Sequence, residues 1–505
     1  MMALIAFPAI AFAQAGSLDA SFGGDGKVTT DFSSKIDVGW SLAIQPDGKI
    51  IVVGETNIGE ALTRDFAIAR YNTDGSPDAS FGSGGKLTTN FGGLANDYAY
   101  SVTLMDDGKI LAAGSTMLSG YRFGLVRYMS DGSFDNTFGT GGFVQTDFGG
   151  MEDLARNVMI DPTGKIVATG FRNDGLKRNF ALIRFNYDGS LDPTFGDGGK
   201  VYTSFATNRH DQSYSSGIQI DGKIVLAGYS YVGTSSDFQF ALARYNTDGT
   251  LDNTFGTGGM VLTDVALVNG QGYSMQIQHD QKIVVAGYSF VGDDVDFTLI
   301  RYNNDGTLDN TFGTGGIVRT DFGAGKEDYA YALTIQNDGK FVVAGNSYHG
   351  TTFDIAVARY NTDGSLDNTF GSGGLVTTDG SGSADGAFCV KTQNDGKIVL
   401  CGYSYSGSSN DFIVVRYNGD NTTGVAENSD QKILQVSPNP FDNSFNINCN
   451  ESGDIRLFDL LGNEILFQNI TSGTTTVSTE HLSDGIYLLQ YHHGDRTENI
   501  KLVKK

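Results

Sequence analysis

The feature that most constrains this chain is a repeat. A Phe-Gly dipeptide inside a Gly/Asp-rich turn occurs seven times, with spacings of 59, 57, 57, 60, 57 and 58 residues. The phenylalanines are Phe22, Phe81, Phe138, Phe195, Phe255, Phe312 and Phe370. A near-constant period identifies a repeat architecture, in which each unit buries its apolar face against its neighbours. The fold must therefore hold seven copies of one unit.

The sequence pattern within each unit predicts four short strands, which we name A to D. In one copy, residues 99–105 form A, residues 109–114 form B after an Asp-Gly turn, and residues 123–129 and 142–148 form C and D. Alternating runs joined by such a turn are typical of a β-hairpin. A coil of a β-solenoid needs only about 20–30 residues. The sequence therefore predicts an all-β fold, a seven-bladed β-propeller.

The two ends of the array predict ring closure by the N-terminal strand. The first copy supplies only a D strand, residues 26–32, ahead of its first A strand, whereas the last copy ends after its C strand at residues 416–418. Strand 26–32 is therefore expected to complete the last blade. It would remove two open sheet edges, which otherwise invite aggregation.

The copies share a consensus. The run "RYNTDGSLDNTFGSGGLVTTD" at 359–379 and its near-copies resemble the delta-60 repeat of bacterial secreted proteins over residues 17–418, and we assign residues 16–420 to the propeller. The resemblance implies no particular activity, because the family is defined by its repeat.

The C-terminal part is a different kind of sequence. After a polar linker, residues 421–433, residues 434–505 alternate like the strands of a small β-sandwich. This tail resembles the C-terminal sorting domain of the type IX secretion system in Pro438-Asn439-Pro440, Asp459-Leu460-Leu461-Gly462, Gly485-Ile486-Tyr487 and its basic end. The resemblance implies contact with that secretion machinery and export by a Gram-negative, Bacteroidetes-type bacterium, into the medium or onto the outer cell surface. An ordinary accessory β-sandwich is the alternative.

The N-terminus predicts the same destination. Residues 1–15 are interpreted as a secretory signal peptide whose basic start is missing, with Ala13-Gln14-Ala15 as a cleavage site before Gly16. A buried first strand or helix is the alternative. No later segment has about 18 uninterrupted apolar residues, so no transmembrane segment is expected.

The net charge limits the classes of binding partner, and the number of cysteines limits the disulfide bonds. The formal net charge of −24 argues against nucleic acid and fits an extracellular protein or one that gathers cations. Three cysteines give no disulfide framework. Cys389 and Cys401 are expected on adjacent strands, where a bridge and two buried thiols are both open.

The repeated turn has two interpretations. In the copy at 361–367, Asp363 and Asp367 are candidate calcium ligands, although calcium needs six to eight oxygens. No other cofactor is expected. The structural interpretation makes Asp363 a turn residue and pairs Asp367 with an inward-facing arginine, because a buried guanidinium must be paired. The arginines of strand C are Arg70, Arg127, Arg184, Arg244, Arg301, Arg359 and Arg416, and their expected partners are Asp78, Asp135, Asp192, Asp252, Asp309, Asp367 and Asp19.

Function is expected where the period is broken. The D-to-A and B-to-C connections vary and should emerge on one face, and loops carry function more often than scaffolds do. The candidate binding residues on this variable face are Glu152, Asp153, Arg156, Arg209, His210, Tyr231, Tyr348 and Tyr405. Covering of apolar blade ends is the alternative role for the aromatic residues.

One position of strand A stands out. The residue seven before the hairpin Asp is Trp40, Tyr100, Tyr214, Tyr273, Tyr331 or Phe388 in six blades, but Arg156 in blade three. With Glu152 and Asp153 close in sequence, Arg156 is the most site-like departure from the period. Drift with a local ion pair is the other interpretation.

The sequence favours binding over catalysis. It holds no HExxH, GxSxG or CxxC motif. We therefore expect an exported binding or structural module that recognises a glycan or a protein. A hydrolase or lyase acting on extracellular polysaccharide, with His210 and Asp211 as its starting point, and a calcium-dependent adhesin are the alternatives.

Overall fold

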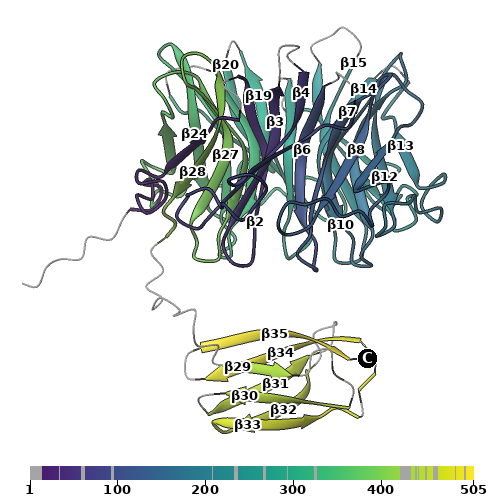
Figure 1. The fold of residues 1–505 in the computed structure, drawn as a ribbon, viewed down its shortest axis with the longest axis vertical. Helices are drawn as coiled ribbons and strands as arrows, with labels where there is room; N and C mark the ends of the chain where they lie inside the picture. Colours follow the sequence, from purple (N-terminus) through teal and green to yellow (C-terminus); the bar gives the residue numbers. More distant parts are fainter. Residues whose placement is uncertain are drawn as a thin grey trace, which may run out of the picture. The chain divides into compact units, whose positions relative to one another are not determined.

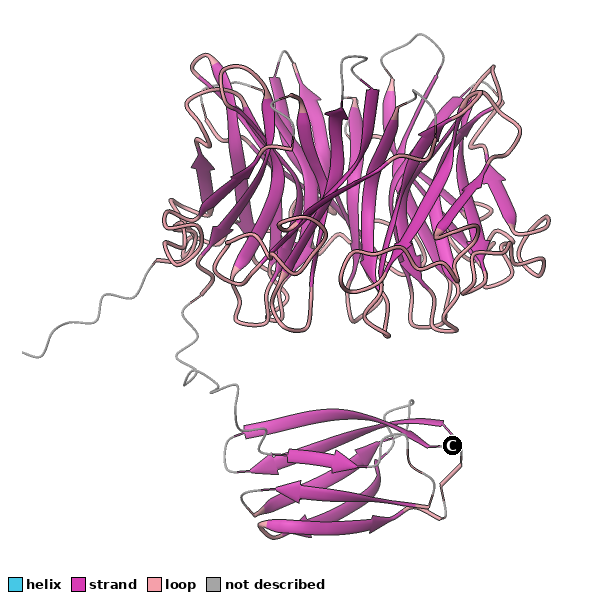
Figure 2. Ribbon diagram, in the orientation of Figure 1, coloured by secondary structure: helices cyan, strands magenta, loops and turns pink. Residues whose placement is uncertain are grey.

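The computed structural model separates the chain into two compact units, Met1–Thr422 and Thr423–Lys505. It describes residues 14–32, 35–58, 63–92, 96–207, 209–232, 237–265, 269–292, 294–323, 327–420, 434–437, 441, 443–449, 452–458, 464–480, 482–483, 485–493 and 496–504. Within these ranges every regular element is a β-strand (Figure 2). Most of the expected signal segment, the linker 421–433 and the tail motifs at 438–440 and 459–462 lie outside the described residues.

The first unit is a seven-bladed β-propeller, whose blades stand side by side in Figure 1. The strands of blades 1 to 3, from A to D, are β2 (Asp37–Ile44), β3 (Ile50–Ile58), β4 (Thr63–Tyr71), β5 (Lys86–Thr89); β6 (Asp97–Leu104), β7 (Ile110–Met117), β8 (Tyr121–Tyr128), β9 (Phe143–Thr146); β10 (Glu152–Ile160), β11 (Ile166–Asn173), β12 (Arg178–Phe185) and β13 (Lys200–Thr203). Those of blades 4 to 6 are β14 (Arg209–Ile218), β15 (Ile224–Val232), β16 (Phe238–Tyr245), β17 (Met260–Thr263); β18 (Gly270–Ile277), β19 (Ile283–Val291), β20 (Asp294–Tyr302), β21 (Ile317–Thr320); β22 (Asp328–Ile335), β23 (Phe341–His349), β24 (Thr352–Tyr360) and β25 (Leu375–Thr378).

Blade 7 combines strands from both ends of the propeller. Its A, B and C strands are β26 (Asp385–Thr392), β27 (Ile398–Tyr405) and β28 (Asn410–Tyr417), and its D strand is β1 (Lys27–Thr30) from the start of the chain. β1 pairs antiparallel with β28, with Lys27 opposite Val415 and Thr30 opposite Phe412. The purple N-terminal segment accordingly lies beside β28 in Figure 1. Hydrogen bonds that would be open at the edge of β28 are thereby satisfied.

The core lies between blades. Strand B carries runs such as Ile50–Val53 that are fully buried on both faces, because each sheet packs against two neighbours. The repeated phenylalanines of the Phe-Gly motif are also fully buried, Phe22 and Phe81 among them. Gly75 of the Asp-Gly turn has φ of 86°, and a Cβ there would lie 3.0 Å from the Gly23 nitrogen of the neighbouring blade. The turn therefore requires glycine at this position.

The second unit has two antiparallel sheets. One contains β29 (Leu434–Ser437), β30 (Ser444–Cys449) and β33 (Gly473–Ser478), and the other contains β31 (Gly453–Phe458), β32 (Glu464–Ile470), β34 (Gly485–His493) and β35 (Arg496–Lys504). Residues of both sheets, including Phe445, Ile455 and Leu489, form one buried apolar cluster. Among the described residues of the whole chain, no helix is long and apolar enough to cross a membrane.

Candidate functional site

The A strands surround the propeller axis and share one irregularity. Each A strand contacts the A strand of the next blade, from β2 and β6 round to β26 and β2. Each also has a β-bulge, at which the pairing with strand B skips one residue. A bulge redirects the side chain of the extra residue. The skipped residues are Trp40, Tyr100, Arg156, Tyr214, Tyr273, Tyr331 and Phe388.

These seven side chains contact one another in order, and we call them the axial ring. Five ring-to-ring contacts have centroid distances of 4.3 to 5.6 Å, between Trp40 and Tyr100, Tyr214 and Tyr273, Tyr273 and Tyr331, Tyr331 and Phe388, and Phe388 and Trp40. Arg156 fills the remaining place, with its Cζ 3.9 Å from the Tyr100 centroid and 5.0 Å from that of Tyr214. The sequence identified these positions as a pattern but did not predict that they meet.

Arg156 is a cation held by aromatic faces. Its Nε is buried without a hydrogen-bond partner, and no described residue forms an ion pair with it. The two acids close to it in sequence are engaged elsewhere: Glu152 Oε2 lies 2.9 Å from Arg178 Nη2, and the fully buried Asp153 accepts the Phe148 N–H at 2.7 Å. Cation–π contacts stabilise the guanidinium but leave its hydrogen-bond donors available.

A cavity of about 510 Å³ borders the axial ring. Its lining follows the A strands from the ring residues toward the A-to-B turns, so it lies on the side away from the variable loops. Hydroxyl and amide side chains dominate the wall, among them Ser41, Ser101, Asn157, Ser274 and Gln276. Arg156 and Lys391 also line it, which makes the cavity polar and positively charged at two points.

Glu55 of β3 contacts the axial ring through Trp40 and was not among the candidates from the sequence. It is 2 % exposed, accepts a hydrogen bond from Trp40 Nε1 at 3.4 Å and forms an ion pair with Arg64 Nη1 at 2.5 Å. Burial raises the pKa of Glu55 to about 7, against the opposing effects of Arg64 and Arg156. The sequence did contain a signal for Glu55, because it is the one acidic residue at this position of the repeat. The other blades hold Ser115, Phe171, Tyr229, Tyr288, Asn346 and Tyr403 after the same glycine.

The remaining variable-face candidates are dispersed over several blades. Arg209 is buried and donates to Ser230 Oγ at 2.7 Å and to Gln239 Oε1 at 2.8 Å, so it joins β14 to β15 and β16. His210 stacks on Tyr231 with centroids 5.0 Å apart.

Two further candidates have local roles. Tyr348 packs edge-on against Phe353, with centroids 5.2 Å apart, and the Tyr405 hydroxyl donates to the Gly407 carbonyl at 3.2 Å. Among the candidates within the described residues, His210 and Tyr231 are the pair brought together.

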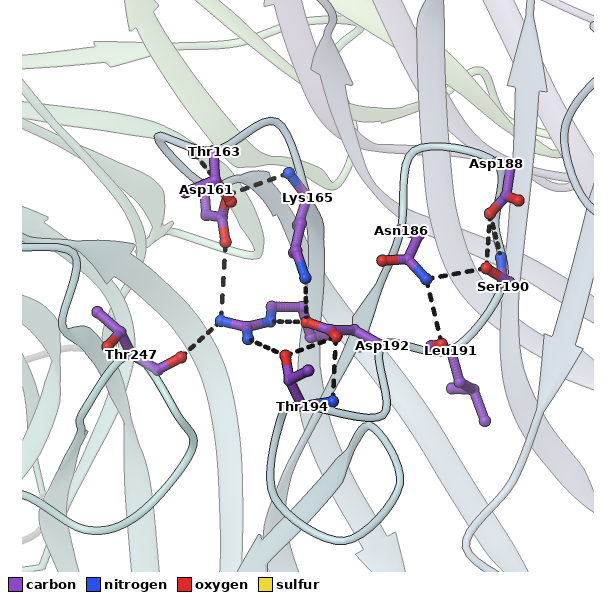
Figure 3. A network of polar contacts seen from close by, with 11 residues as sticks. Asp161, Thr163, Lys165, Asn186, Asp188, Ser190, Leu191, Asp192, Thr194 and Thr247 are labelled. Carbon is purple, nitrogen blue, oxygen red and sulfur yellow. Dashed lines mark hydrogen bonds and ion pairs between the residues drawn. The ribbon is translucent and has the colours of Figure 1, made fainter.

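The arginine and aspartate of every repeat form an ion pair. Arg Nε lies 2.7 to 2.8 Å from the expected Asp in six blades, and Arg359 reaches Asp367 through Nη2 at 2.8 Å. A lysine of the A-to-B turn contacts the same carboxylate, as Lys165 does for Asp192 at 2.6 Å (Figure 3). In that blade Arg184 also donates to the Thr247 carbonyl of the next blade. The network thus ties adjacent blades together.

These contacts favour the structural interpretation of the repeated turn. Asp363 Oδ1 accepts hydrogen bonds from Ser365 within the turn. Asp367 Oδ2 faces Lys340 at 3.1 Å and Arg359 at 2.8 Å. Burial alone would raise the pKa of Asp367, but the hydrogen bonds from Thr369 and the two cations outweigh it and hold the pKa at about 2. A carboxylate already neutralised twice is a poor calcium ligand.

Cys389 and Cys401 are directly opposite on β26 and β27, and both are free thiols in the structure. A hydrogen bond from Cys401 lowers the pKa of Cys389 to about 6, and Cys389 also lines the axial cavity.

Comparison with protein families identifies the class. A model described as "Domain of unknown function (DUF5122) beta-propeller" matches residues 45–81, 106–138, 162–195, 219–255, 278–312, 336–370 and 393–422. A model described as "Secretion system C-terminal sorting domain" matches residues 435–505. Fold and matches together define an exported β-propeller protein. More particularly, the chain consists of seven DUF5122 propeller repeats and a type IX sorting domain, which confirms the predicted repeats, tail and export to the surface or surroundings of a Bacteroidetes-type bacterium.

Solved structures give distant likenesses. The polysaccharide lyase Uly1 is 12 % identical, with a TM-score of 0.43 over 75 % of this chain and 90 % of its own. PorZ, a surface component of the type IX secretion system of Porphyromonas gingivalis, is 10 % identical, with a TM-score of 0.31 over 90 % and 68 %. The β-propeller domain of the Trilobed protease from Pyrococcus furiosus is 9 % identical, with a TM-score of 0.37 over 76 % and 94 %. No curated protein matches the sequence.

Proposed function

We propose that this exported propeller is a binding module without catalysis, and that its axial cavity takes an anionic group of an extracellular glycan or protein. The observation that carries the proposal is Arg156, which lines the cavity with a buried, unpartnered Nε and no ion pair to a described residue. Arg156 is half-buried, and a guanidinium that is partly withdrawn from water gains from pairing with an anion. A carboxylate or sulfate in the cavity would supply the missing charge.

The other cavity residues fit such a ligand. Lys391 adds a second cation to the lining. Ser101 donates a hydrogen bond to Asn157, which in turn donates to Ser216, so they fix the wall beside Arg156. Tyr100 and Tyr214 already orient the guanidinium from either side. A planar guanidinium fixed in this way is suited to bidentate binding of a carboxylate.

The variable loop face is a second proposed surface, for recognition of a larger glycan or protein. His210 and Tyr231 support it, because their stacked rings form an aromatic platform of the kind that binds sugar faces or apolar side chains. His210 is half-buried, so one part of the stack is accessible.

Glu55 is the observation that favours the alternative, a propeller lyase or hydrolase. A carboxyl with a pKa of about 7 is suited to general acid–base catalysis near neutral pH. However, Glu55 is 2 % exposed and already bound by Trp40 and Arg64. These contacts favour a structural role, and Glu55→Gln would remove any turnover of an acidic polysaccharide if the alternative held.

Calorimetric titration of the full chain tests the binding proposal. Sodium glucuronate should bind with a measurable heat, and glucose, which lacks the carboxylate, should not. Arg156→Tyr, which gives blade 3 the residue found in blades 2, 4, 5 and 6, should weaken glucuronate binding at least tenfold. Arg178→Gln, in the same blade but outside the cavity lining, is the matched control. Equal binding by both variants would contradict the proposal.

A further inference from the structure

Three groups of carboxylates gather at corresponding places in blades 5, 6 and 7, and we call them the carboxylate triads. In each triad, one oxygen per residue lies within 4.8 Å of the others. Each includes an aspartate of strand C, five residues before the repeat arginine, and the aspartate that directly follows strand D. The triads are Asp294, Asp296 and Asp321; Asp354, Asp379 and Asp385; and Asp411, Asp31 and Asp37.

The triad of blade 7 contains a buried acceptor without a donor. Asp37 is fully buried; its Oδ2 accepts the Phe32 N–H at 2.7 Å, whereas its Oδ1 has no hydrogen-bond partner. Burial raises the pKa of Asp37 to about 6, against the opposing effects of the Phe32 amide and the Thr56 hydroxyl, and the charges of Asp31 and Asp411 raise it further. Among the described residues, neither Asp37 nor Asp411 forms an ion pair.

Blade 5 repeats the observation. Asp296 is half-buried, and its Oδ1 has no hydrogen-bond partner. Burial, Asp294 and Asp321 raise the pKa of Asp296, whereas Arg319 acts in the opposite direction. An unsatisfied buried carboxylate oxygen beside two further carboxylates is unfavourable, because desolvation and like-charge repulsion act together.

Other blades place a positive or donating group of the protein at this position. In blade 2, Arg122 replaces the strand C aspartate, and its Nε lies 3.2 Å from Oδ2 of Asp147, which follows strand D. In blade 1, Asn90 replaces the aspartate after strand D and donates to Asp65 Oδ1 at 2.7 Å. In blades 1 and 2, a side chain of the protein itself therefore compensates the carboxylate at this position. The three triads lack the corresponding arginine or asparagine.

We propose that the carboxylate triads bind divalent cations of the calcium class, one ion per triad. Calcium prefers carboxylate and carbonyl oxygens at about 2.3–2.6 Å, so two of its ligands lie at most about 5 Å apart, as the triad oxygens do. In blade 7 the ion joins β28 to the connection between β1 and β2. It thus fastens the N-terminal strand where the last blade meets the first. These residues are separate from Asp363 and Asp367 of the repeated turn.

Calcium binding to the full chain tests this inference. After treatment with a chelator, equilibrium dialysis against calcium should give three ions per chain. Asp411→Asn should reduce the number by one, and Arg122→Asp, which recreates the acidic pattern in blade 2, should raise it by one. Asp395→Asn, in an exposed A-to-B turn, should leave it unchanged. An unchanged number in both the Asp411 and the Arg122 variants, or no bound calcium, would overturn the proposal.

Melting temperature provides an independent readout. A ligand that binds only the native state stabilises it, so calcium should raise the melting temperature of the wild type. In chelator, Asp411→Asn should melt above the wild type because it removes repulsion, and in calcium it should melt below. A purely structural role for Asp411 would give the same order in both buffers, and that result would overturn the inference.

Discussion

Arg127 and Arg156 lie in neighbouring blades, but their surroundings differ. Arg127 is fully buried, pairs with Asp135 at 2.7 Å and donates to the Tyr187 carbonyl of the next blade. Arg156 lies between two tyrosine rings and forms no ion pair with a described residue, although its charge lowers the pKa of Glu55. Arginines that recur in every repeat are paired with an aspartate of the scaffold, whereas the arginine that breaks the period forms no ion pair with a described residue. This difference is the basis of the proposal that Arg156 binds a ligand.

The largest expected effect is the loss of stability in acid, because acid protonates the aspartates of the repeated Arg–Asp pairs. The pKa of Asp19 and Asp367 is held at about 2, and those of the equivalent aspartates lie still lower. The unfolded chain therefore binds more protons between about pH 4 and pH 2, and stability is lost as the pH falls through this window. The free energy of unfolding in urea should be lower at about pH 2.5 than at about pH 5, by the summed contribution of these aspartates. Asp367→Asn should lose less unfolding free energy over this range than the wild type, and an identical pH dependence would contradict this account.

Substitution of one repeat arginine should cause the next largest loss of unfolding free energy. Arg127→Met leaves Asp135 buried with Lys109 as its remaining cation, and the loss of one partner of a buried pair costs roughly 3–5 kcal/mol. The free energy of unfolding in urea measures it. Arg122→Gln, which removes a partly exposed pair with Asp147, should cost less than about 1 kcal/mol. Similar losses for the two variants would mean that burial of the network does not determine its contribution.

The carboxyl group of Glu55 should change the free energy of unfolding by a smaller amount, and in the opposite direction with pH. Its pKa of about 7 in the folded protein lies above the ordinary value of 4.5, so the folded state binds more protons in this range. Stability from this group is therefore present below about pH 4.5 and lost as the pH rises toward 7. The difference in unfolding free energy between wild type and Glu55→Gln, measured from pH 4 to pH 8, should change in favour of the variant. A constant difference would show that Glu55 keeps an ordinary pKa.

The repeat made most of the fold predictable. Seven copies at six near-constant spacings predicted seven blades, and the incomplete first and last copies predicted the pairing of residues 26–32 with the last C strand. Strand phase predicted pairs such as Arg70 with Asp78. These features are local or recur in every unit, so a single sequence contains seven examples of each.

The site was less predictable because it depends on contacts between units. The alternation of strand A gives no sign that a bulge directs Trp40 and Arg156 toward one axis. The triad of blade 7 joins Asp31 with Asp411, from opposite ends of the propeller sequence. Position in a repeat is visible in the sequence, but the meeting of residues from different blades is a property of the assembled ring.

The most direct test of the central claim, that recognition lies where the period is broken, uses the fluorescence of Trp40. This residue is the single tryptophan of the chain and belongs to the axial ring. Titration with glucuronate should change its emission in a saturable way in the wild type and in Arg178→Gln, but not in Arg156→Tyr. An equal change in Arg156→Tyr, or an equal change on titration with glucose, would contradict the account.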